Sequence, residues 1–134
     1  MDVAETSAVS LDGRFFALGY KDGRAVLYNS AGEPLPAFKS QAENAPVVAF
    51  SRNGKLLATG NYDGTVKLWD TTSRRELLTL RGTPYPVVSI AFSNDETKLA
   101  SLDAYGYLRV WHAPIGAGAS PKSKPFETLS ISGR

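Results

Sequence analysis

The chain has 134 residues, of which 43% are hydrophobic and 21% are charged, and its formal net charge is +2. These values are typical of one soluble globular domain with an apolar core. The small net charge and the scattered basic residues argue against a nucleic-acid partner. The absence of cysteine excludes a disulfide framework and a thiolate metal site. Because we find neither a secretory signal nor a stretch as long as a membrane span, we expect a cytoplasmic protein without a membrane partner.

One sequence unit occurs three times along the chain. Each copy has a turn, a short apolar run, a second turn and a run that ends in an aromatic residue. The first marker is the serine of the opening turn, at Ser10, Ser51 and Ser93. The second marker is the closing aromatic residue, at Tyr28, Trp69 and Trp111. Both markers are spaced by 41 and then 42 positions, so two independent features keep one period.

The second copy shows most clearly which strands to expect. Its apolar run lies between the turns Asn53-Gly54 and Asp63-Gly64, which indicates a buried strand with a hairpin partner after it. A β-branched run precedes this pair and a weakly alternating run follows it. The expected strands are at 46–50, 55–60, 65–69 and 76–80. Each copy is therefore predicted to be a four-stranded antiparallel meander.

A repeat of about 40 to 45 residues that ends its third strand in an aromatic residue is typical of β-propeller blades. We therefore predict an all-β protein, a propeller segment of three blades at about 1–40, 41–82 and 83–134. The last blade carries extra residues at 114–125, whose Gly, Ala, Ser and Pro composition predicts a flexible insertion.

Three blades are too few to close a ring, since propellers have about four to eight. Terminal repeats expose their core faces unless something covers them. Three explanations follow: the chain is part of a longer propeller protein, two copies form a six-bladed ring, or another protein caps an open arc. Each of them supplies the missing blades or cover from a different source.

The stretch at 57–70, Leu-Ala-Thr-Gly-Asn-Tyr-Asp-Gly-Thr-Val-Lys-Leu-Trp-Asp, closely resembles the WD-repeat family. The likeness weakens in the other copies, where Trp-Asp becomes Tyr28-Asn29 and Trp111-His112. Members of this family are propellers that act as protein-interaction platforms and rarely as enzymes. The resemblance therefore implies a noncatalytic interaction or scaffold module. The alternative is a sensor or regulatory segment of a larger multidomain enzyme or signalling protein.

Many blades of the family contain a buried network that joins a strand Ser or Thr, a turn Asp and the tryptophan. The resemblance assigns this structural role to Thr59, Asp63 and Trp69. Ser101 and Trp111 match the same pattern in part.

The sequence predicts no catalytic, cofactor or metal site. His112, the one histidine, stands at a strand end without a second histidine to form a metal pair. The aspartates at 12, 22, 63 and 95 all lie in turns, where such side chains cap backbone N–H groups. We therefore expect that the protein is not an enzyme.

The resemblance places the turn between the second and third strands, and the connection into the next blade, on the narrower face where partner peptides bind. The predicted partner-binding residues are Tyr20, Lys21, Glu43, Asn44, Asn61, Tyr62, Tyr85, Asp103 and Tyr105. Four of these nine residues are tyrosines. Tyrosine suits such a surface because it buries a large area at small entropic cost and keeps a polar tip.

Overall fold

The computed structural model describes residues 3–36, 38–39, 44, 46–81, 84–112 and 127–132, with the backbone alone for 38–39 and 127–132. The first sheet contains β1 (Ala4–Val9), β2 (Phe15–Tyr20), β3 (Arg24–Asn29) and β4 (Phe38–Lys39). The second sheet contains β5 (Val47–Phe50), β6 (Leu56–Gly60), β7 (Thr65–Asp70) and β8 (Glu76–Arg81). The third sheet contains β9 (Val87–Phe92), β10 (Lys98–Asp103), β11 (Tyr107–His112) and β12 (Glu127–Ser132).

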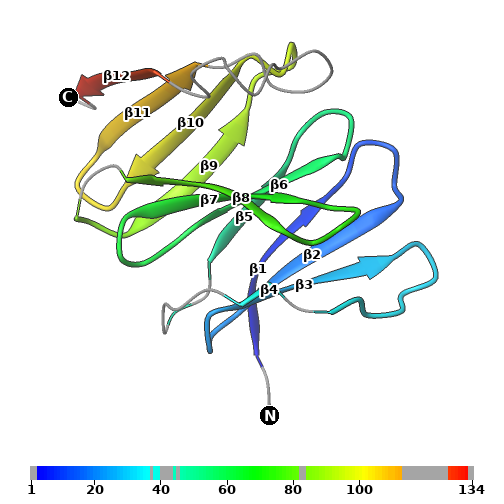
Figure 1. Ribbon diagram of the computed structural model, residues 1–134. Coiled ribbons are helices and arrows are strands. Elements are labelled where there is room, and N and C mark those ends of the chain that lie inside the picture. Colours follow the sequence, from blue (N-terminus) through cyan, green and yellow to red (C-terminus); the bar gives the residue numbers. More distant parts are fainter. Residues whose placement is uncertain are drawn as a thin grey trace.

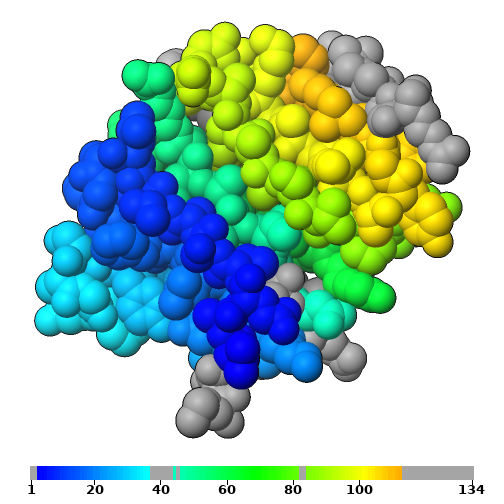
Figure 2. Space-filling view, turned by 180° about the vertical axis from the view of Figure 1, so that it is seen from behind, coloured from blue at the N-terminus to red at the C-terminus, as the bar shows by residue number. Residues whose placement is uncertain are grey.

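Each sheet is an antiparallel meander in which strands that are consecutive in the chain are hydrogen-bonded neighbours. The first strands β1, β5 and β9 lie side by side, and the three sheets spread outward from them (Figure 1). From behind, the blue, green and yellow segments lie next to one another on one face (Figure 2). The described residues thus form three blades of a β-propeller that do not close into a ring. The predicted fold class is confirmed.

The four strands of the second sheet begin and end within one residue of the predicted bounds. No helix among the described residues is long and apolar enough to cross a membrane. The predicted flexible insertion at 114–125 lies outside the described residues.

All three sheets use the same turn between their first and second strands. In the second sheet Ser51 Oγ donates to Asn53 Oδ1 over 2.9 Å and accepts from Leu56 N over 3.1 Å. In the first and third sheets Asp12 and Asp95 replace Asn53 and also accept a backbone N–H within the turn. These aspartates cap turns, as the sequence predicted. One local hydrogen-bond pattern therefore explains why the serine marker recurs.

The apolar core consists of two layers, each between two neighbouring sheets. The layer between the first and second sheets contains Ala17, Ala25, Leu27, Val48, Leu57 and Trp69. The layer between the second and third sheets contains Ala58, Val66, Leu68, Leu80, Val87, Leu99 and Trp111. Trp69 therefore packs against the sheet that precedes its own, and so does Trp111. Ser101 is also buried, with 6% of its surface exposed.

Of the predicted network, Thr59 is buried and bonds Trp69, whereas Asp63 is exposed and, among the described residues, bonds only within its own turn. The indole N–H of Trp69 donates to Thr59 Oγ1 over 3.0 Å, and Thr59 is 1% exposed. Asp63 Oδ1 accepts from Thr65 N over 3.0 Å and from Thr65 Oγ1 over 2.6 Å. Thr59 thus holds the tryptophan, while Asp63 holds the turn that links the two strands.

Two glycines allow the sheets to approach closely. A Cβ atom on Gly60 would lie 2.9 Å from Val87 Cβ, and one on Gly19 would lie 3.3 Å from Pro46 Cδ and closer still to the Pro46 carbonyl oxygen. Real Cβ atoms essentially never come within 3.0 Å of such neighbours. At Gly60 the space that a side chain would need is occupied by Val87, the first residue of β9, and at Gly19 it is occupied by Thr6 and by Pro46, the residue before β5.

Candidate interaction face

The turns between second and third strands and the connection from β8 to β9 meet at one end of the sheets. Val87 N, at the start of β9, donates to the Asn61 carbonyl oxygen over 3.0 Å. On the other side of the same connection, Ala104 N donates to the Pro86 carbonyl oxygen over 2.9 Å. The backbone of the connection is therefore held between the turns of two sheets. We call this surface, made by residues 20–23, 61–64, 84–86 and 103–106, the turn face.

Three tyrosines of the turn face are exposed. Tyr62 is 58% exposed, Tyr105 is 65% exposed and Tyr85 is 36% exposed. The ring centroids of Tyr85 and Tyr105 lie 4.3 Å apart, with the planes tilted by 47°. Such a pair is worth about 0.5–1.5 kcal/mol beyond its buried area. This contact orders two of the three exposed rings before any partner binds.

The prediction that all the predicted partner-binding residues face a partner needs correction at two positions. Asn61 and Asp103 are only 1% and 6% exposed. Asn61 Nδ2 donates to Thr65 Oγ1 over 3.1 Å. Asp103 Oδ1 accepts from Tyr105 N over 2.9 Å and from Tyr107 N over 3.0 Å. The two side chains hold the turns that carry the exposed tyrosines, and in this conformation they offer no surface.

The first sheet contributes differently to the turn face. Tyr20 is half-buried, its hydroxyl forms a 2.6 Å hydrogen bond with the Tyr28 hydroxyl, and Arg24 Cζ lies 5.0 Å from its ring centroid. The backbone N–H and the guanidinium of Arg24 hold the pKa of Asp22 below its usual value. Lys21 beside it is exposed. The first-sheet end of the turn face therefore carries the positive charge of Lys21 and the negative charge of Asp22. It also carries the ring of Tyr20, which contacts Tyr28 and Arg24.

The two remaining predicted residues lie in the connection from β4 to β5. Asn44 is exposed. Glu43 lies outside the described residues. Within the described ranges no three His, Asp or Glu side chains come together in a way that could hold a metal ion. The described residues of the turn face offer aromatic stacking, hydrogen bonding through phenol groups, the ammonium of Lys21 and the exposed carboxylates of Asp22 and Asp63.

Two residues of interest escaped sequence reasoning. Tyr107 is 48% exposed and follows the turn of the third sheet directly. Glu96 has φ 61°, in the region where the equivalent turns have Gly13 and Gly54, and its Oε1 accepts from Asn53 N over 2.7 Å. A glutamate where the other two copies have glycine was the visible signal, because side chains are strained at this φ. Its carboxylate joins the opening turns of two neighbouring sheets.

Comparison with known proteins agrees with this geometry. The sequence model of the WD40 family, described as "WD domain, G-beta repeat", matches residues 38–70 and 74–112, which is more than half of the chain. The chain therefore belongs to the WD40 repeat family, and the resemblance noted in the sequence is confirmed. The matched residues fall almost wholly in the second and third copies.

The relatives are themselves WD-repeat proteins of greater length. The chain is 32% identical over 117 residues to the Periodic tryptophan protein 2 homolog of Schizosaccharomyces pombe, which covers 84% of the chain and 14% of that protein. It is 28% identical over 121 residues to WD repeat and HMG-box DNA-binding protein 1 of Xenopus laevis, covering 83% of the chain and 11% of that protein. It is 51% identical over 47 residues to Dynein assembly factor with WD repeat domains 1 of Danio rerio, covering 35% of the chain and 11% of that protein. The chain spans less than a sixth of the length of each of these relatives.

Proposed function

We propose that this chain is a noncatalytic module that binds a protein or peptide partner through its turn face. WD40 repeats generally mediate protein–protein interactions, and the chain belongs to that family. The observation that carries the proposal is the gathering of Tyr62, Tyr85 and Tyr105 at one end of the sheets, all exposed. A cytoplasmic location stays a prediction.

The energetics of the turn face favour binding. Exposed tyrosines that a folded backbone already orients lose little conformational entropy when a partner covers them. The Tyr85–Tyr105 pair is ordered by its own ring contact, and Asp103 fixes the turn beneath Tyr105. The face is therefore suited to a partner segment that places an apolar or aromatic side chain against this pair and pairs an acidic group with Lys21.

Alanine substitutions test the proposal. Replacing Tyr62 and Tyr105 with alanine should weaken the binding free energy of the partner by about 2 kcal/mol or more if they are hot spots. The stability of the fold should change little, since both side chains are exposed. A pull-down with this chain would supply the partner, and titration calorimetry would measure the affinity. Leu77→Ala is the matched control, because Leu77 is 54% exposed on the outer strand β8, away from the turn face.

A competing hypothesis places the partner-binding site on the insertion at 114–125 instead of the turn face. Changing Lys122 and Lys124 should leave the affinity unchanged, because the repeat pattern places this connection at the opposite end of the blade. Loss of binding in the lysine variant with full binding in the tyrosine variant would move the site to the insertion. Turnover of any substrate that an aspartate substitution abolishes would overturn the noncatalytic assignment.

A further inference from the structure

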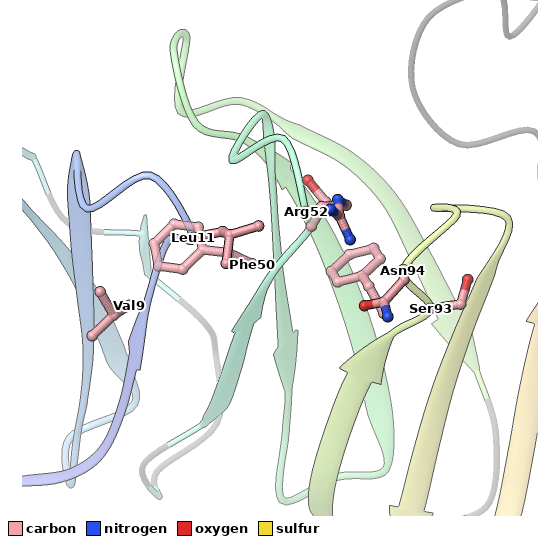
Figure 3. A pocket seen from close by; sticks show the side chains of 8 residues that line it. Val9, Leu11, Phe50, Arg52, Ser93 and Asn94 are labelled. Atoms are coloured by element: carbon pink, nitrogen blue, oxygen red, sulfur yellow. The ribbon is translucent and has the colours of Figure 1, made fainter.

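A second surface lies at the other end of the inner strands, where β1, β5 and β9 finish. A groove of about 180 Å³ crosses these strand ends (Figure 3). It is lined by the last residue of each strand, by the turn residue two positions later and by two of the turn serines: Val9, Phe50, Phe92, Leu11, Arg52, Asn94, Ser51 and Ser93. The groove therefore uses the same two positions of all three repeats.

The apolar part of this groove is open to solvent. Val9 is 60% exposed and Leu11 is 71% exposed, and the phenyl groups of Phe50 and Phe92 are half-buried. A closed apolar cavity of about 150 Å³ holds one benzene molecule, whereas drug-sized ligands need about 300 Å³ or more. The volume therefore fits one aromatic ring rather than a cofactor.

One charge of the groove is available. Arg52 is exposed and forms no ion pair with any described residue. The acidic side chains of the neighbouring turns are already engaged: Asp12 with Arg14, Asp95 with Ser93 and Thr97, and Glu96 with the backbone N–H of Asn53. The guanidinium is thus free to bind a carboxylate from outside the chain.

We propose that this groove binds an acidic peptide segment that carries an aromatic side chain. The aromatic ring lies against Leu11, Phe50 and Phe92, and a neighbouring carboxylate of the peptide pairs with Arg52. The size of the groove selects the ring and the free guanidinium selects the acidic residue. This site lies at the opposite end of β5 and β9 from the turn face, so a partner can occupy each face independently.

The test uses three short peptides and the whole chain. The probe is N-acetyl-Glu-Phe-Glu-amide, and the matched probes are N-acetyl-Gln-Phe-Gln-amide and N-acetyl-Glu-Ala-Glu-amide. Titration followed by backbone amide chemical shifts should move the signals of Arg52, Ser93 and Asn94 with the first probe. The Gln probe should bind about threefold to fivefold more weakly, since an exposed ion pair contributes up to about 1 kcal/mol and each 1.4 kcal/mol is tenfold. The Ala probe should also bind more weakly, because it lacks the ring that fills the groove.

Variants separate the groove from nonspecific attraction. Arg52→Gln should weaken binding of the first probe by about threefold to fivefold, because it removes the ion pair. Leu11→Ala should also weaken it, because it removes part of the apolar wall. Both residues are exposed, so neither change should disturb folding, which the amide spectrum itself reports. Arg75→Gln is the control, because Arg75 is exposed in a turn of the same sheet and does not line the groove. Equal binding by Arg52→Gln, or shifts centred on Tyr62 and Tyr105, would overturn the proposal. The latter outcome would leave the turn-face proposal standing.

Discussion

The junction between the first and second sheets and the junction between the second and third sheets share an apolar plan but differ in their polar ties. Both bury a tryptophan against the preceding sheet and both use a glycine for close approach. In the first junction Thr6 Oγ1 donates to the Pro46 carbonyl oxygen at the turn-face end, and at the other end a Cβ on Gly54 would lie 3.8 Å from Ser10 Cβ, which is ordinary van der Waals contact.

The second junction is tied by hydrogen bonds at both ends. Val87 N donates to the Asn61 carbonyl oxygen at the turn face, and Asn53 N donates to Glu96 Oε1 at the opposite end. The apolar packing is thus common to both junctions, whereas the hydrogen bonds between the sheets differ. Different residues form the hydrogen bonds between the sheets at each junction, so a substitution can remove such a bond from one junction and leave the other junction unchanged.

The third sheet presents a further contrast on its outward side. Leu102 occupies the position that Gly19 and Gly60 hold in the first two sheets, and it is half-buried. At those glycines a residue at the start of the next sheet, Pro46 or Val87, lies where a Cβ would be. A strand could not approach the third sheet in the same way without displacing Leu102. A blade or partner that covers this side must therefore pack at a wider spacing.

The largest expected effect comes from breaking the first junction with Trp69→Ala. Removing a buried tryptophan costs about 3–5 kcal/mol. This loss is a large part of the 5–15 kcal/mol typical of a whole domain. Urea unfolding followed by circular dichroism measures the change. Because Trp69→Ala could abolish folding, Trp69→Phe serves as the graded variant. A tryptophan variant as stable as the wild-type chain would contradict the register of β6 and β7.

A methyl group added at Gly60 should test the close approach of the second junction. In Gly60→Ala the new atom overlaps Val87, and overpacking of this kind costs about 1–3 kcal/mol. Leu102→Ala is the comparison, expected to cost about 1 kcal/mol or less because no further sheet packs on that side of the described residues. The urea concentrations at the midpoints of unfolding of the two variants measure this difference in stability. If the Leu102 variant is the less stable one, the close approach at Gly60 does not set the spacing.

The tie that distinguishes the second junction can be removed with Glu96→Ala. This change leaves Asn53 N without its acceptor and keeps the backbone at φ 61°, so the expected cost is about 1–2 kcal/mol. Glu96→Gly should cost less, since glycine relieves the backbone strain at this φ. Equal stability of the alanine variant and the wild-type chain would mean that the tie contributes nothing.

The sequence predicted those parts of the structure that depend on contacts within one repeat. Trp69 and Thr59 lie ten positions apart on adjacent strands of one hairpin, so the strand register alone brings them together. The Glu96–Asn53 tie could not be predicted, because it spans 43 positions and depends on how two sheets pack. Burial of Asn61 was missed for the same reason, since the connection before β9 covers a turn that looks solvent-exposed in the sequence.

The smallest expected effect concerns the opening turns, which differ between the sheets in one titratable group. Asp12 and Asp95 hold the capping position in the first and third sheets, and Asn53 holds it in the second. The backbone N–H of Arg14, with Ser10 Oγ and the Arg14 guanidinium, lowers the pKa of Asp12 to about 2. Hydrogen bonds from the Ser93 and Thr97 hydroxyls hold the pKa of Asp95 well below its usual range.

A carboxyl group whose pKa is lower in the folded state than its unfolded value of about 3.9 stabilises the fold at higher pH. Its contribution is fully present above about pH 4 and is lost as the pH falls through the folded pKa, which for Asp12 is about 2. The first turn should therefore loosen between about pH 4 and 2, and the third turn over a range that reaches lower pH, while the Asn53 turn should not loosen. Amide exchange rates of Arg14, Lys55 and Thr97 across this range measure the difference. Asn53→Asp should make the second turn acid-sensitive too, and an unchanged Lys55 exchange rate in that variant would show that the capping carboxylate is not the cause.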